Sequence, residues 1–268
     1  MYNRKLLILL AGMMILSSIW PALALATSEI NTGALLDAPS SPAEELKWKQ
    51  ATAEKDRLAR DAYKEFEKQR KGKVSANATT WLINVTNYIQ EKSNWCGPAC
   101  ARQTLSWHKL VSGSSTALPS QSTLASQIGT NSSGSSTAKI ADALNLYKTT
   151  YSIPDYYIAS DIAGYSNPTE TFRIRIFTDI TSSTTNLAPI VLLATQYLPR
   201  YNGASYRHYN TIDGYYDRSP IKMNTVDPHY DSRYSGHHWD PMGSTTVNGV
   251  CRAVYKADLA GTNKAMAW

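Results

Sequence analysis

Apolar and polar residues follow two different periods along this chain of 268 residues, and the period changes near the middle. The first half has apolar residues spaced by three and four, which predicts helices over 43–70, 96–110, 120–128 and 137–147. The second half has short apolar or alternating runs, which predict strands over 189–195, 206–215 and 221–227, after an earlier short strand at 81–88. Because helices come first and strands later, the pattern predicts an α+β fold.

One run carries both periods. Within 172–180, Phe172, Ile174 and Ile176 alternate as in a strand, whereas Phe172, Ile176 and Ile180 repeat at helical spacing. We predict a helix for this run.

The first 26 residues have the pattern of a secretory signal peptide. Arg4 and Lys5 precede an apolar stretch over 6–15, and small residues at 24–26 form a cleavage site. A single-span anchor is the alternative, but Pro21 and two serines leave the apolar run short for a bilayer, which needs about 20 residues. We therefore expect cleavage, export and no stable membrane insertion of the mature chain.

Residues 27–75 differ in composition from the rest and precede a predicted catalytic domain at 76–268. They hold 19 of the 48 charged residues, and Ser41-Pro42-Ala43-Glu44 is a capping box that starts a helix. The apolar stripe of this helix is thin, and its members are Leu58, Ala59, Ala62, Tyr63 and Phe66. We expect it either to dock through Leu58, Ala62 and Phe66 or to stay mobile, and to serve as a removable pro-segment or as a spacer.

The net charge of +6 does not by itself exclude any class of function. Two of these charges belong to the predicted signal peptide, and no arginine-rich patch indicates nucleic-acid binding. A mildly basic exported protein is expected to adhere to anionic cell walls. The oligomeric state is not encoded in these features.

The strongest chemical signal is Gln90, followed six residues later by Cys96-Gly97-Pro98 at a predicted helix start. Proline fits the first turn of a helix, and the partial positive charge there favours a thiolate over a thiol. Cys96 is therefore the candidate nucleophile of a cysteine hydrolase. The Gln90 amide and the backbone N–H of Cys96 are the candidate donors to the oxyanion.

His208 and Asp227 are the candidate partners of Cys96. His208 begins an alternating strand. We expect this strand to form a hairpin with 221–227 in which the residue numbers of each opposed pair add up to 435. His208 then lies opposite Asp227, close enough for the carboxylate to orient the imidazole. The same register pairs Asp213 with Lys222 as an exterior ion pair. A slip by one residue would move Asp227 to the other face.

Several other residues have structural interpretations. We expect Cys100 to fill the core or to form a disulfide with Cys251, and His108 to lie in the core or at a helix end. The C-terminal cluster lacks a recognised ligand spacing, so we expect an exposed loop and no metal or cofactor there; its members are His229, His237, His238 and Asp240.

These motifs resemble those of papain-fold cysteine peptidases related to the bacteriocin-leader (double-glycine) peptidases, cysteine-peptidase family thirty-nine. The resemblance covers about 80–240 and rests on Gln-x5-Cys-Gly-Pro-Ala, His-Tyr-Asn-Thr-Ile-Asp-Gly-Tyr and Val-Asp-Pro. It implies a papain-like fold, with a catalytic helix packed on an antiparallel sheet. It also implies Cys96 as nucleophile, His208 as base, Asp227 as orienting carboxylate and Gln90 as oxyanion donor.

Three functions fit these observations. We favour a secreted cysteine peptidase acting on peptide or protein substrates. A non-peptidase amide hydrolase acting on cell-wall peptides would use the same groups. A catalytically silent binding module on the same fold is the third, but it has no physical need for all four residues.

Overall fold

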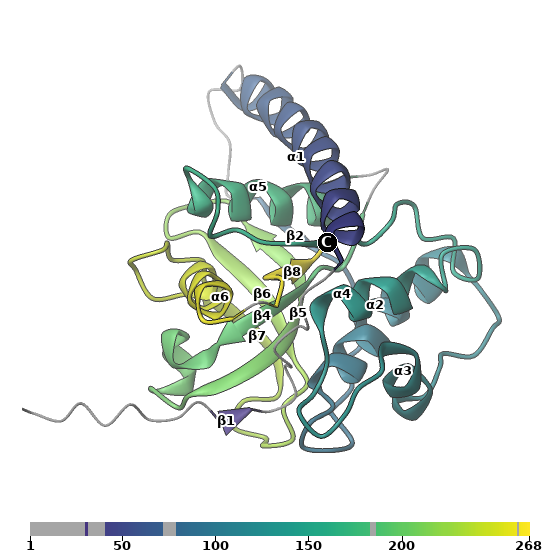
Figure 1. The fold of residues 1–268 in the computed structure, drawn as a ribbon. Helices are drawn as coiled ribbons and strands as arrows, with labels where there is room; N and C mark the ends of the chain where they lie inside the picture. Colours follow the sequence, from purple (N-terminus) through teal and green to yellow (C-terminus); the bar gives the residue numbers. More distant parts are fainter. Residues whose placement is uncertain (1–29, 32–40, 72–78, 183–185, 262) are drawn as a thin grey trace, which may run out of the picture.

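The computed structural model describes residues 30–31, 41–71, 79–182, 186–261 and 263–268 (Figure 1). The predicted signal peptide at 1–26 lies outside these residues. The helices are α1 (Pro42–Lys71), α2 (Cys96–Ser112), α3 (Gln121–Ile128), α4 (Thr137–Asn145), α5 (Pro168–Thr181) and α6 (Val250–Leu259). The strands are β1 (Ile30–Asn31), β2 (Thr80–Leu82), β3 (Ala159–Ser160), β4 (Ile190–Ala194), β5 (Tyr206–Tyr216), β6 (Lys222–Asp227), β7 (Gly236–Pro241) and β8 (Met266–Ala267).

All the described strands form one sheet in the order β3-β8-β4-β5-β6-β7, with β1 and β2 also paired to β5. Every pairing is antiparallel except that of β1 with β5. The long strand β5 therefore connects most of the sheet, and the candidate base His208 lies near its beginning.

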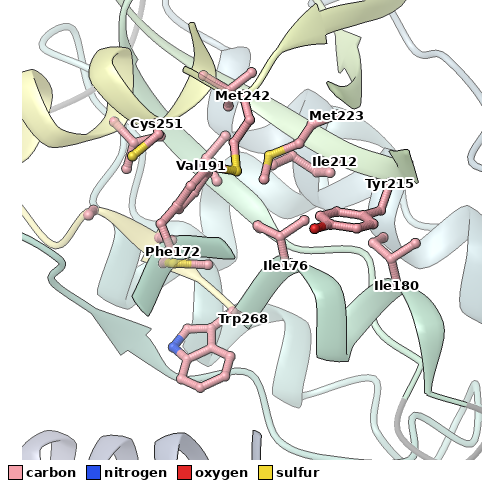
Figure 2. Packing of buried hydrophobic residues seen from close by; sticks show 14 of the residues in the cluster. Phe172, Ile176, Ile180, Val191, Ile212, Tyr215, Met223, Met242, Cys251 and Trp268 are labelled. Carbon is pink, nitrogen blue, oxygen red and sulfur yellow. The ribbon is translucent and has the colours of Figure 1, made fainter. Parts of the chain in front are cut away.

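Helices cover both faces of this sheet (Figure 1). The five residues of β4 are fully buried because alternate side chains point to different helices. Those packing with α2, α3 and α4 are Ile190, Leu192 and Ala194, and those packing with α5 and α6 are Val191 and Leu193. Figure 2 shows the second of these cores, where Phe172 and Ile176 of α5 face Val191 and Ile212 of the sheet.

The helical prediction for 172–180 is confirmed by α5, whose first turn is capped by Asn167. The short strands β1, β3 and β8 were not predicted, and neither were two longer elements, β7 and α6. Residues 236–241 form the edge strand β7 instead of a loop, and only Asp240 in it is buried, so no alternating apolar pattern marks it. Helix α6 does carry a helical apolar stripe, which the sequence analysis did not assign.

Helix α1 packs on α5 and β3 through a face that includes only part of the predicted stripe. Its buried residues are Thr52, Asp56, Ala59 and Tyr63, and Phe66 packs beside them. Leu58 and Ala62 are exposed, so the prediction that they dock the helix is wrong. The error has a simple cause: a stripe spaced by three and four that includes Asp56 and Ala59 excludes Leu58.

A buried ion pair fastens α1 to α5. Both oxygens of Asp56 accept hydrogen bonds from Arg175, at 2.8 and 2.9 Å. The Arg175 side chain has no exposed surface, and its guanidinium also lies 4.6 Å from the ring centre of Trp268. The interpretation of 27–75 as a pro-segment or spacer stays a prediction, but α1 itself shares a core with the sheet domain.

Replacing Asp56 by alanine is expected to destabilise the protein by about 3–5 kcal/mol, because it leaves the Arg175 charge buried without its partner. Equilibrium urea unfolding of the whole chain measures this loss. The matched control is Glu54→Ala on the same helix, which breaks an exposed pair with Arg57 and is expected to leave the free energy of unfolding nearly unchanged. Equal losses in the two variants would contradict the structural role given to Asp56.

Within the part of the chain that the structure describes, no helix is both long enough and apolar enough to cross a membrane.

Candidate active site

The candidate nucleophile Cys96 is the first residue of α2. Its backbone N–H lies in the first helical turn, where no carbonyl of the same helix can accept it. The next residue must be glycine, because a Cβ on Gly97 would lie 2.5 Å from Oγ of the buried Ser135. Pro98 fits because the first turn requires no N–H donor. The sequence Cys-Gly-Pro therefore begins the helix and lets the neighbouring loop approach it closely.

Helix α2 is fixed against β5 one turn after this cysteine. The Cys100 thiol lies 3.3 Å from the carbonyl oxygen of Tyr209, and Thr211 donates a hydrogen bond to Gln103 at 2.8 Å. These contacts place the start of α2 beside the start of β5. The side chain of Cys96 is hydrogen-bonded to His208 as a result.

The imidazole of His208 also contacts Asp227, with 2.9 Å between its Nε2 and the carboxylate Oδ1. Since Nε2 is engaged by the carboxylate, Nδ1 is the nitrogen left for the thiol. All three side chains have no exposed surface. The structure thus brings together the cysteine, histidine and aspartate that the sequence predicted.

The predicted hairpin register is nevertheless wrong. Ile212 pairs with Thr225, so the residue numbers of opposed pairs add up to 437 in this part of the hairpin. A β-bulge at Asp213 raises that total to 438 for the pairs closer to the turn. Before the bulge the shift is two residues, which keeps His208, Asn210 and Ile212 on the same face of the sheet as Asp227. Asp227 therefore reaches His208 as a diagonal neighbour and not as the residue directly opposite.

The predicted exterior pair of Asp213 with Lys222 does not form. Lys222 pairs with Tyr216 in the sheet, and the bulge buries Asp213, whose carboxylate lies 3.0 Å from Nδ1 of His237. Burial raises the pKa of Asp213, although the contact with His237 lowers it in part. Asp213 is a buried structural carboxylate and is separate from the candidate triad.

Asp227 is surrounded by donors that the sequence analysis did not assign to the site. Besides the imidazole, it accepts hydrogen bonds from Arg200 at 2.7 Å, Tyr201 at 2.6 Å and Asn210 at 3.2 Å. The backbone N–H of His229 donates to it at 2.9 Å. Asn210 could have been found, because it shares a strand face with His208; Arg200 and Tyr201 come from a 3-10 turn that no local motif marks.

These contacts have opposite effects on the two titrating groups. Burial by itself lowers the pKa of His208, but the Asp227 charge and the hydrogen bonds to Asp227 and Cys96 outweigh it and raise the pKa to about 9. Burial by itself raises the pKa of Asp227, yet the charges of His208 and Arg200 hold it well below its usual range. The pair is therefore an imidazolium and a carboxylate at neutral pH.

Gln90 lies beside the candidate triad, but its side-chain amide is engaged in other hydrogen bonds and does not act as the predicted oxyanion donor in this conformation. Its backbone N–H donates to the carbonyl of Pro228, just after β6, which holds it near Asp227. Its side-chain nitrogen donates to the carbonyls of Lys92 and Ser93, each at 2.8 Å. Its Oε1 is buried without a hydrogen-bond partner among the described residues. In this conformation the amide supports its own loop.

A protein-family model, described as the Peptidase C39 like family, matches residues 82–256. This chain belongs to that family. The matched region contains all four candidate residues and excludes α1. Membership agrees with the observed α+β, papain-like fold, in which the helix that begins at Cys96 packs on an antiparallel sheet, and it supports a cysteine peptidase.

Two other comparisons complete this finding. A search of curated proteins gives no match. A solved structure titled "Crystal structure of UfSP from C.elegans" aligns with a TM-score of 0.36 and 16% sequence identity. The alignment covers 59% of this chain but only 29% of that chain.

The remaining cysteines and histidines of this family member have structural partners. All three cysteines are free, so the alternative of a Cys100–Cys251 disulfide does not hold. His108 is buried and bonded to the hydroxyl of Tyr157 at 2.8 Å. Among the described residues no group of three or more metal-ligating side chains could hold a metal ion. His238 instead contacts the carbonyl of Tyr234 at 2.8 Å.

Proposed function

We propose that this protein is a secreted cysteine peptidase that hydrolyses peptide bonds in peptide or protein substrates. One observation carries the proposal: Cys96 begins a helix and contacts His208, whose other ring nitrogen is held by Asp227. This is the arrangement that nucleophilic acyl transfer requires. Family membership supports the reaction class. Secretion is proposed from the N-terminal sequence pattern alone.

In the proposed reaction the Cys96 thiolate attacks the scissile carbonyl carbon and forms a tetrahedral oxyanion. The His208 imidazolium then protonates the amine that leaves as the C–N bond breaks, which yields an acyl-enzyme. A water molecule gives a proton to the neutral imidazole and attacks the thioester. Collapse of the second intermediate releases the carboxylic acid and restores the thiolate and the imidazolium.

The proposed oxyanion donors are the backbone N–H of Cys96 and the side-chain amide of Gln90. For Gln90 this requires a rotation, because its nitrogen now donates to the carbonyls of Lys92 and Ser93. Substrate binding would have to replace one of these acceptors with the developing oxyanion.

Alkylation tests the proposal without knowledge of the substrate. With iodoacetamide at pH 7, Cys96 is expected to react at least about tenfold faster than Cys100 and Cys251, because only Cys96 has an imidazolium partner. The other two thiols have pKa values raised by burial, and all three are buried, so burial does not distinguish them. Time-resolved peptide mapping by mass spectrometry measures the three rates. Equal, slow rates would indicate a catalytically silent module.

A further inference from the structure

His229 places an unused hydrogen-bond donor beside the candidate base. Its side chain is 99% buried, and the centre of its ring lies 5.3 Å from that of His208. Its Nε2 has no hydrogen-bond partner among the described residues. Buried polar atoms are nearly always paired, so an unpaired one next to a catalytic group needs an explanation.

The hydrogen bonds around His229 determine which nitrogen carries the proton. The backbone N–H of Asp231 donates to Nδ1 at 2.9 Å, so Nδ1 is an acceptor and the proton of the neutral ring lies on Nε2. Burial, together with the nearby charge of His208, lowers the pKa of His229 to about 4. The ring is therefore a neutral donor at pH 7 and does not compete with His208 for a proton.

Aromatic rings hold His229 in place without satisfying it. Tyr230 stacks on it with 4.5 Å between ring centres, and the ring centres of Tyr206 and Tyr234 lie 5.2 and 5.1 Å from that of His229. Aromatic faces are weak acceptors compared with a carbonyl oxygen. The donor is thus held in place and has no strong acceptor among the described residues.

We propose that the Nε2–H of His229 donates a hydrogen bond to a main-chain carbonyl oxygen of the bound peptide, beside His208. A neutral donor suits a neutral carbonyl, and a peptide chain supplies such carbonyls at every residue. This inference rests on the proposed peptidase function. It makes His229 a substrate-binding residue that acts on peptide recognition and not on the ionisation of Cys96.

Two alkylating reagents separate recognition from ionisation. Iodoacetamide reports the state of the Cys96 thiolate, whereas a peptidyl chloromethyl ketone must also bind through its main chain. The peptidyl reagent is the one of a panel that labels Cys96 fastest in the wild-type chain. The variants are His229→Phe, which keeps a ring but removes the donor, and His229→Gln, whose amide nitrogen restores a donor at a similar distance.

For His229→Phe we expect labelling by the peptidyl reagent to fall about 5- to 30-fold, with the iodoacetamide rate within about twofold of wild type. His229→Gln should recover most of the peptidyl rate. The inference is overturned if His229→Phe labels normally, if both reagents slow in parallel, or if His229→Gln is as slow as His229→Phe. If no peptidyl reagent labels wild-type Cys96 faster than Cys100, the proposed function itself fails.

Discussion

Replacing Cys96 by alanine is expected to abolish peptide hydrolysis, with a loss of at least about 10³-fold in kcat. Without the thiolate no acyl-enzyme can form, and alanine is compatible with the first turn of α2. The fold should be retained, because only one sulfur atom is removed. Hydrolysis of a quenched fluorescent peptide library and the melting temperature of each variant measure these two expectations.

Cys100→Ala is the matched control, because it removes a second buried thiol from the same helix. That thiol contacts the carbonyl of Tyr209 and has no contact with His208 in the described hydrogen bonds. The variant should hydrolyse peptides at nearly the wild-type rate, with a small loss of stability. If Cys100→Ala is inactive and Cys96→Ala is active, the assignment of the nucleophile is wrong.

Replacing Asp227 by asparagine is expected to lower kcat/KM by about 10²- to 10⁴-fold. The amide removes the charge that opposes desolvation of the His208 imidazolium. The wild-type pKa of about 9 means that the imidazolium is present at lower pH and is lost as the pH rises through 9. The alkaline limb of kcat/KM should therefore lie near pH 9 and move toward lower pH in Asp227→Asn. A pH profile of both proteins checks this shift.

Asp213→Asn provides the comparison, because it changes a buried carboxylate on the neighbouring bulge that pairs with His237. Its effect should be on stability, with activity and the alkaline limb nearly unchanged. Equal and mild losses of activity at both positions would show that Asp227 does not orient His208.

The candidate triad could be predicted because its signals are local. Cys96-Gly-Pro marks a helix start, and the alternating run after His208 fixes the direction of its side chain. The contact of Asp227 with His208 was predicted correctly although the register was wrong. The register error there was two residues, which leaves Asp227 on the same strand face. The bulge at Asp213 has one local signal, Gly214 inside the strand, but a glycine does not fix where the extra residue is inserted, so the exact pairing could not be predicted.

Other features depended on contacts between distant segments. Arg200 and Tyr201 contact Asp227 from a short 3-10 turn that lies 26 or more residues before it in the chain. The buried face of α1 includes the charged residue Asp56, which only its partner Arg175 makes compatible with burial. A prediction that counts apolar residues alone therefore chose Leu58 instead of Asp56. The apolar pattern indicated that a helix forms but not how it packs.

The contacts of Arg175 show that the region matched by the family and the region that packs into one core have different boundaries. The region shared with the family runs from 82 to 256, and it contains every candidate catalytic residue. Two of the groups that contact the buried guanidinium, Asp56 and Trp268, lie on either side of that region. A fragment trimmed to the shared region would keep the candidate catalytic residues. It would lose Asp56, however, and so leave the Arg175 charge without its carboxylate partner. We therefore expect a chain trimmed to residues 82–256 to be less stable than the whole chain.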